Sequence, residues 1–408
     1  MRGPPRTSNT QTPHGPPATA GDSGDGRRYH ALDNLRAWMM LLLIPFHAAL
    51  PFLTVPALMR FNDPDAGVAF DATALFLLSF RRPVFFVMGG FFAAMLLERR
   101  GVRGMLANRA QRILAPLVLG WIVLSPATHA AYDFALGAAN GGSTRAGMAK
   151  LGEGDWIDWE RPFHLWFLAA LLIFYAAALG LRWALPRILG RHLWAYEEGT
   201  RRFFASRWRA LLLAAALAPL LVPSEFLPYN RGNPFLALSL ALMFGLGGRL
   251  YVHRDLLGEL RRGAWTHVVL GFALLPLATW TRWNVVHDSP HELAWGLVSG
   301  LSGTLMSALL VFGTIGVFLR HADGHSRALR YLSDSSYWVY LAHMPVVVVL
   351  GGLFATTELP AVLKFTLTVA GTTVFTLATY SLFVRHTAIG RLLNGPRRRG
   401  GSVAGKSI

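Results

Sequence analysis

An arginine and a histidine eleven residues apart stand out in the first apolar stretch of the chain, LDNLRAWMMLLLIPFHAAL. At about 100° per residue, a helix brings Arg36 and His47 to one face, about 16 Å apart along its axis. A guanidinium at the membrane boundary suits a phosphate-bearing ligand. An imidazole near mid-membrane suits general-base catalysis, because it titrates near neutrality. The separation is similar to the reach of an extended pantetheine arm, so the pair suits an acyl-CoA with its phosphates at Arg36 and its thioester at His47.

Two neighbours strengthen this interpretation of the first stretch. Asp33 lies three residues before Arg36, where it can pair with the guanidinium or fix its rotamer. Pro45 removes a backbone donor beside His47, so we expect the helix to open there. A plainer interpretation also fits, in which Arg36 snorkels to the membrane surface and a neighbouring helix simply hydrogen-bonds His47.

Two arginine pairs follow in the sequence. Arg81 and Arg82 lie inside the second apolar stretch, where charges should point into the protein or snorkel to the surface. Arg109 and Arg112 are three residues apart, so an α-helix places them on one face at the membrane boundary, where they can grip a phosphate together. An ordinary cluster of positive charges at the inner membrane surface explains the second pair equally well.

Two more histidines mark later apolar stretches. His164 precedes Trp166 where the fourth stretch begins, and His343 lies about two turns into the ninth. A lone buried histidine is most often simply hydrogen-bonded, so either residue can orient groups rather than catalyse. The chain has no cysteine, no P-loop, no HExxH motif and no GxSxG with triad partners, and its histidines do not cluster at metal-ligand spacing. We therefore expect no metal and no permanently bound cofactor.

Helices across a membrane must position these residues. Of the 408 residues, 53% are hydrophobic and only 15% are charged, against about 25% charged in soluble domains. A water-soluble enzyme is therefore close to excluded. Ten apolar runs approach the length that a membrane span needs, roughly 37–56, 73–97, 113–133, 164–182, 210–223, 235–250, 264–281, 294–319, 337–355 and 362–384. We predict an all-α integral membrane protein with about ten transmembrane helices in one bundle.

The basic residues indicate how this bundle is oriented. If the amino terminus is cytoplasmic, the segments inside hold 30 of the 39 Lys and Arg residues, which is the positive-inside pattern. This predicts two cytoplasmic termini and explains the net charge of +17 by contact with the lipid bilayer, without nucleic acid. We expect a disordered arm over 1–28, a membrane domain over 29–390 and a basic tail over 391–408.

The longest external loop, about 134–163, has a Gly-rich start that suggests flexibility. Its Trp- and acid-rich end suits either carbohydrate contact or an interfacial tryptophan belt.

Taken together, these motifs resemble the membrane acyltransferase-3 family. The segments that carry the resemblance occur in the family's order: LDNLRAWMMLLLIPFHAAL, FRRPVFFVMGGFF, NRAQRILAP, HLWFLAALL and SSYWVYLAHMPV. Within the family, the chain is most similar to the branch associated with O-succinylation of periplasmic glucans. One departure is Gly89-Gly90, where the family usually has Ser-Gly, so no role of that serine hydroxyl carries over.

The resemblance implies a bacterial inner-membrane O-acyltransferase. Its co-substrate would be a cytoplasmic acyl-CoA, with a succinyl or an acetyl group, and its acceptor a hydroxyl of a periplasmic glucan or another envelope carbohydrate. The resemblance implies that Arg36 and His47 are the essential pair and that Arg109 and Arg112 belong to the donor side. His47 would act as general base or carry the acyl group itself. Asp33, Arg81, His164, Trp166 and His343 would line the cavity, with Arg81 facing a succinyl carboxylate or an oxyanion.

Two other functions use the same residues. A transporter or flippase for a carbohydrate or lipid-linked sugar would use the buried charges as a substrate path. A scaffold subunit of an envelope-polysaccharide complex would tolerate alanine at Arg36 and His47. The sequence carries no signal for the oligomeric state.

Overall fold

The apolar runs form helices throughout the part of the chain that the structure describes. The computed structural model describes residues 29–55, 61–154, 162–227, 233–287, 289–322 and 327–394, and these contain helices, turns and coil but no strand. The predicted arm and most of the predicted tail lie outside the described residues. The all-α class is therefore confirmed for the described part of the chain.

The longer helices follow the apolar runs in order. They are α1 (His30–Leu41), α2 (Leu43–Ala49), α3 (Val68–Arg109), α4 (Ala115–Gly141), α6 (Trp166–Leu189), α8 (Arg209–Ser224), α9 (Pro234–Val252), α11 (Ala264–Ala273), α12 (Leu275–Val286), α13 (Glu292–His321), α14 (Arg327–Ala355) and α15 (Ala361–Thr379). Shorter helices connect them: α5 (Thr144–Gly152), α7 (Leu193–Ala205), α10 (Leu257–Arg261) and α16 (Ala388–Asn394). Two π-helical turns, η2 (Ala110–Leu114) and η6 (Tyr380–Val384), and four 3₁₀ turns, η1 (Leu50–Phe52), η3 (Phe163–Leu165), η4 (Gly190–His192) and η5 (Arg254–Leu256), complete the described elements.

Eight helical segments of the described residues are long and apolar enough to cross a membrane. The longest, Val68–Gly141, has 74 residues and contains two of the predicted spans. It bends at Gly101, whose φ of 64° is a conformation that glycine adopts readily. The fifth predicted span corresponds to α8, which has only 16 residues. The chain is thus a multi-pass membrane protein, and the number of ten spans stays a prediction.

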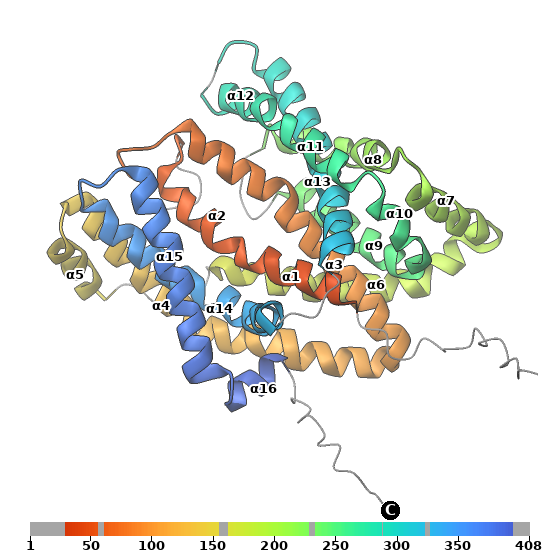
Figure 1. Cartoon of the computed structure of the whole chain (residues 1–408), viewed down its shortest axis with the longest axis horizontal. Coiled ribbons are helices and arrows are strands. Elements are labelled where there is room, and N and C mark those ends of the chain that lie inside the picture. Colours follow the sequence, from red (N-terminus) through yellow and green to blue (C-terminus); the bar gives the residue numbers. More distant parts are fainter. Residues whose placement is uncertain are drawn as a thin grey trace, which may run out of the picture.

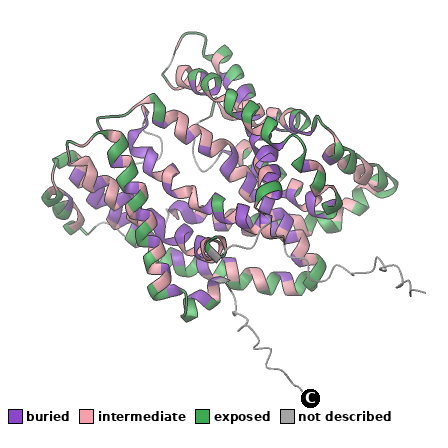
Figure 2. Ribbon diagram, in the orientation of Figure 1, coloured by how far each residue is buried: buried purple, intermediate pink, exposed green. Residues whose placement is uncertain are grey.

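Helices α1 and α2 lie in the middle of the bundle. Figure 1 shows them crossing the centre of the view, with α5 and α7 at opposite edges of the molecule. Buried residues gather around this centre in Figure 2, and exposed residues cover the periphery. Leu32, Leu35 and Ile44 have at most 1% of their surface exposed. A pair of helices surrounded in this way can hold polar side chains away from lipid.

Helices α3 and α9 touch through glycines. A Cβ added to Gly90 would lie 1.8 Å from the carbonyl oxygen of Phe244, and a Cβ added to Gly247 would lie 1.8 Å from that of Val87. Only glycine leaves room for two backbones this close. Gly90 and Gly247 therefore serve the close packing of α3 against α9. Asn233 starts α9 by accepting bonds from two backbone N–H groups, and Pro234 follows at the first helical position.

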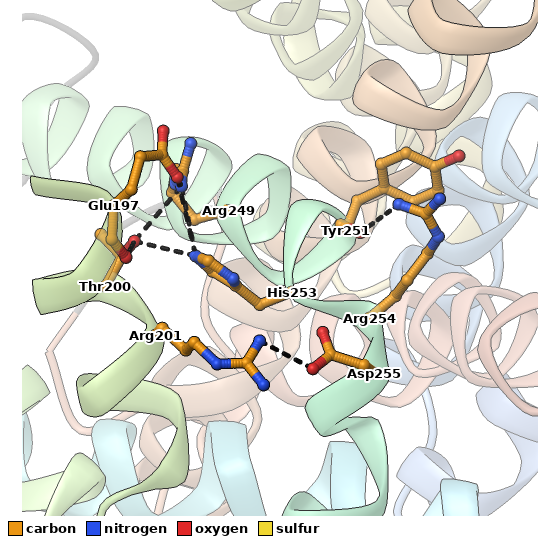
Figure 3. Close-up of polar contacts among 8 residues, drawn as sticks. All are labelled: Glu197, Thr200, Arg201, Arg249, Tyr251, His253, Arg254 and Asp255. Atoms are coloured by element: carbon orange, nitrogen blue, oxygen red, sulfur yellow. Dashed lines mark hydrogen bonds and ion pairs between the residues drawn. The ribbon is translucent and has the colours of Figure 1, made fainter. Parts of the chain in front are cut away.

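Helix α7 is tied to the end of α9 by a polar cluster (Figure 3). The Glu197 carboxylate accepts from Arg249, and Thr200 Oγ1 lies 2.9 Å from His253 Nε2. A second ion pair joins Arg201 to Asp255 at 2.7 Å. Burial and the Arg249 guanidinium disfavour the imidazolium, which holds the pKa of His253 below its usual value. His253 is therefore neutral near pH 7, and its hydrogen bond with Thr200 links α7 to the end of α9.

The predicted flexible start of the loop over 134–163 is helical, so that prediction was wrong. Helix α4 continues to Gly141, and α5 begins directly after Ser143, whose side chain accepts a bond from Ala146 N. The glycines act here as spacers: a Cβ on Gly147 would lie 2.8 Å from the carbonyl oxygen of Phe134. Gly-rich sequence thus allows α5 to pack closely on α4. The Trp- and acid-rich residues 155–161 lie outside the described residues.

Candidate active site

Three histidines from distant parts of the chain converge next to α2. His47 lies on α2, His164 on η3 and His343 on α14. The Nε2 atom of His343 lies 3.0 Å from Nδ1 of His47. The ring of His343 lies 5.0 Å from the ring of His47 and 5.2 Å from that of His164. We call these three residues the histidine cluster.

The helix that carries His47 is broken just before it. Helix α1 ends at Leu41 and α2 begins at Leu43. The proline at position 45 has no N–H to donate, so it cannot complete the helical ladder across this point. The predicted opening near Pro45 is therefore confirmed. Within α2, Nδ1 of His47 also lies 3.1 Å from the carbonyl oxygen of Leu43.

Helix α14 and η3 are held together by the other two histidines. His164 Nε2 lies 3.0 Å from the carbonyl oxygen of Leu341, and the Tyr340 hydroxyl donates to the carbonyl oxygen of His164 at 2.9 Å. His343 Nδ1 lies 2.7 Å from the carbonyl oxygen of Tyr340. Reciprocal bonds of this kind fix both rings relative to the backbone.

The three rings differ in accessibility. His343 is fully buried and His164 is 6% exposed, whereas His47 is only partly buried. A reacting group must be reachable by substrate, and of the three rings only that of His47 belongs to a residue that is not buried. Within the histidine cluster, His47 is the ring best placed to meet a substrate.

A buried arginine accompanies the cluster. Arg81 on α3 is 6% exposed, and its guanidinium lies 4.8 Å from the centre of the Phe46 ring. It is close enough for its charge to act on His47 and His343. A fixed positive charge in a poorly solvated site stabilises negative charge that develops nearby. Of the two placements expected for Arg81, its burial shows the one inside the protein.

A group of arginines gathers at the other end of α1. Arg112 lies close enough to Arg36, Arg100 and Arg109 for their like charges to interact. Arg109 lies over the Tyr175 ring at 4.9 Å. Like charges repel in a partly desolvated site, so this arrangement is suited to bind an anion. We call these four residues the arginine group.

Arg36 lies near the middle of α1, the first helix of the central pair. Its guanidinium lies 5.4 Å from the Phe92 ring and 3.7 Å from a carboxylate oxygen of Asp33. The predicted pairing with Asp33 is therefore confirmed. The Arg36 side chain is 39% exposed, so it can still meet a ligand.

The Arg109–Arg112 segment does not form the regular α-helix that we expected. Arg109 is the last residue of α3, and Arg112 lies within the π-helical turn η2. The carbonyl oxygen of Arg112 accepts from the Tyr337 hydroxyl at 2.7 Å, since the residue four positions on is Pro116, which has no N–H to donate. The two guanidinium groups remain close, but a π-turn rather than one α-helical face brings them together.

Helix α14 connects the two groups of side chains. Tyr337 contacts the segment of the arginine group, and six residues later His343 contacts His47.

No role was predicted from the sequence for four residues of this region, Tyr175, Tyr337, Tyr340 and Arg100. A usable signal existed for the tyrosines, because each is a polar residue within an apolar run. Their partners could not be inferred, since the contacts join separate helices.

Trp166 lies beside the cluster rather than within it. It begins α6, and its ring lies 6.1 Å from that of Phe167, which in turn lies 5.9 Å from Tyr340. Its contact with the histidine cluster is therefore indirect. Among the described residues, no set of three His, Asp or Glu side chains is arranged to hold a metal ion.

A buried ion pair fixes the segment that follows α2. Lys364 Nζ lies 2.9 Å from a carboxylate oxygen of Asp63, and both side chains are almost fully buried. The Asp63 N–H donates to the carbonyl oxygen of Pro51 at 2.8 Å. Because Pro51 lies four residues after His47, this pair anchors the chain that follows the histidine cluster.

Comparison with known protein families adds the class of enzyme to this multi-pass membrane fold. The model of the acyltransferase-3 family, described as an acyltransferase domain, matches residues 29–382. The chain therefore belongs to this family. The match spans every residue of the histidine cluster and the arginine group.

Its curated relatives include bacterial proteins named glucans biosynthesis protein C. The one from Escherichia coli O139:H28 (strain E24377A / ETEC) is 23% identical over 341 residues, which cover 80% of this chain and 83% of the relative. The one from Escherichia coli K12 is 22% identical over 333 residues, with the same coverage of both chains. No solved structure gives a significant match to the chain.

Proposed function

We propose that this acyltransferase moves a succinyl group from a cytoplasmic acyl-CoA to a hydroxyl of a periplasmic glucan, across the bacterial inner membrane. An acetyl group or another envelope carbohydrate is the alternative substrate within the same reaction. The name of the relatives supports a glucan acceptor. The reaction is an O-acyl transfer that turns a thioester into an ester.

The proposal rests on one observation: the arginine group and the histidine cluster lie at different positions along the central helices α1 and α2. The arginine group lies at the Arg36 end, and the histidine cluster lies around His47. Arginine suits phosphate because its planar fork makes paired, charge-assisted bonds. An acyl-CoA bound in this way has its phosphates on the arginines and its thioester near His47.

The chemistry at His47 needs only a base and a stabilised oxyanion. His47 takes the proton of the acceptor hydroxyl as the oxygen attacks the thioester carbonyl. The C–S bond then breaks, and the protonated imidazole returns its proton to the leaving thiolate. The products are an ester and free CoA. Arg81 would stabilise the oxyanion of the tetrahedral intermediate or bind the distal carboxylate of a succinyl group.

The test is acyl transfer by the purified protein in proteoliposomes with succinyl-CoA, acetyl-CoA and glucan, followed by mass spectrometry of the glucan. We expect His47→Ala to fold and insert but to lose ester formation by at least a hundredfold, as for removal of a general base. His386→Ala is the matched control, because His386 is an exposed histidine outside the site.

Ester formation at the wild-type rate by His47→Ala would remove His47 from the mechanism. Glucan that crosses the membrane without any gain of ester would indicate a transporter instead. When succinyl-CoA and acetyl-CoA are present together, the ratio of succinyl to acetyl ester on the glucan identifies the acyl group that the enzyme prefers.

A further inference from the structure

We propose that His343 is a positioning residue, which holds the proton of His47 on Nδ1 and leaves Nε2 as the atom that accepts the hydroxyl proton. The inference rests on the proposed function, because it specifies how His47 acts as the base. It starts from three nitrogen–oxygen distances and one nitrogen–nitrogen distance.

The first step concerns His343. Its Nδ1 atom lies 2.7 Å from the carbonyl oxygen of Tyr340 and 3.2 Å from that of Val339. A carbonyl oxygen can only accept, so Nδ1 of His343 must carry a hydrogen. His343 is fully buried, where a charged ring is costly unless it is paired. The neutral ring therefore has a lone pair on Nε2.

The second step concerns His47. Its Nδ1 atom lies 3.0 Å from Nε2 of His343 and 3.1 Å from the carbonyl oxygen of Leu43. Both neighbours are acceptors, so Nδ1 of His47 is the donor. Neutral His47 consequently has its lone pair on Nε2, the nitrogen away from His343.

The third step is the consequence for the reaction. A base with a fixed tautomer needs no rearrangement before it takes a proton, and the same logic orients histidine in hydrolytic triads. When Nε2 accepts the hydroxyl proton, the new imidazolium is stabilised by its Nδ1–H bond to His343. His343 itself gains and loses no proton, and its own place is set by the α14 backbone.

A positioning role for His343 places a chemical requirement on the side chain at position 343 that a purely structural contact would not. The residue must present an acceptor towards His47, whereas its bond to Tyr340 only holds the ring in place. Glutamine places an acceptor oxygen near the position of Nε2. Asparagine is shorter and can donate to the Tyr340 carbonyl without reaching His47. Leucine fills the space but has no polar atom.

The experiment compares His343→Gln, His343→Asn and His343→Leu in the proteoliposome assay, with thermal stability measured for each. We expect kcat to fall about 10- to 100-fold in the Asn and Leu variants, as for loss of an orienting partner of a histidine. The KM for acyl-CoA should stay within about twofold, because the arginine group is untouched. The Gln variant should recover most of kcat.

Nitrogen-15 NMR of histidine-labelled protein gives a second readout. The wild type and the Gln variant should show the Nδ1–H tautomer for the resonance that disappears in His47→Ala. The Leu variant keeps only the Leu43 carbonyl as an acceptor for Nδ1 of His47, so it should show a larger share of the Nε2–H tautomer than the wild type. Wild-type kcat in the Leu variant, or equal loss in Gln and Leu with an unchanged tautomer, would overturn the inference. In either case an inactive His47→Ala leaves His47 as the base of the proposed function, whereas an active one removes both the role of His47 and that of His343 while acyl transfer itself stands.

Discussion

Arg36 combines exposure with a position in a crowded group of positive charges. Its side chain is 39% exposed, and it interacts with Arg112 through like-charge repulsion. An anionic ligand relieves this repulsion and gains charge-assisted hydrogen bonds at the same time. The fork of a guanidinium, rather than charge alone, is what a phosphate would use.

We therefore expect Arg36→Lys to raise the KM for acyl-CoA about 10- to 100-fold, the effect of losing one strong hydrogen bond to a charged group. The change in kcat should be smaller, because the reacting atoms lie at His47. Steady-state kinetics in proteoliposomes measure both constants. Arg320→Lys, at the exposed end of α13, is the control. A KM unchanged by Arg36→Lys would place the donor phosphates elsewhere.

At this scale the sequence predicted individual residues better than their contacts. The spacing of Arg36 and His47 singled out both as candidates, and Pro45 predicted the helix break. The bond between His47 and His343 joins positions 296 residues apart. Such a contact depends on how whole helices pack, and no local pattern in one sequence encodes it. The π-turn at Arg112 was missed for a related reason, since its carbonyl is satisfied by Tyr337 on another helix.

At the level of elements, the contact between α3 and α9 sets where Arg81 lies. Helix α3 carries Arg81 beside the histidine cluster and, beyond the bend at Gly101, Arg109 in the arginine group. Gly90 and Gly247 hold α9 directly against this helix. A side chain at either position would push the two backbones apart, which is a form of overpacking.

We expect Gly90→Ala to destabilise the protein by about 1–3 kcal/mol or more, seen as a lower unfolding temperature in detergent. Gly245→Ala is the matched control on α9, because a Cβ there meets nothing within 4 Å. In an exposed helical position this second change should be neutral or slightly stabilising. Equal unfolding temperatures for the two variants would contradict the packing argument.

The apolar periodicity predicted most helices, and the errors have a physical cause. Long glycine- and alanine-rich stretches resemble flexible loops by composition, yet α4 and α5 use glycine to approach each other. The short run at α8 has 16 residues, fewer than a straight span usually needs.

For the whole molecule, the distribution of basic residues predicts which face is cytoplasmic. Helices α5 and α7 lie at opposite edges of the molecule (Figure 1). Met148 on α5 is 60% exposed and Trp194 on α7 is 72% exposed. A label at either position therefore reports which side of the membrane that helix faces. The chain contains no cysteine, and a single introduced thiol is therefore the only reactive one.

We expect a membrane-impermeant maleimide to label Met148→Cys in intact spheroplasts, and Trp194→Cys only after permeabilisation. The positive-inside bias is the physical reason, since arginine-rich segments are retained in the cytoplasm. The opposite orientation in the membrane would follow if Trp194→Cys were labelled in intact spheroplasts and Met148→Cys only after permeabilisation. The arginine group would then lie on the side that lacks acyl-CoA.

The widened turn Ala110–Leu114 has a consequence for how this region tolerates change in length. Each residue removed from a continuous helix rotates everything after it by about 100°. The π-turn, however, holds one residue more than an α-helical turn, so deleting Gln111 would convert it into regular α-helix and keep α3 and α4 in register. Natural variation in length should therefore concentrate in this turn and spare the helices on either side of it.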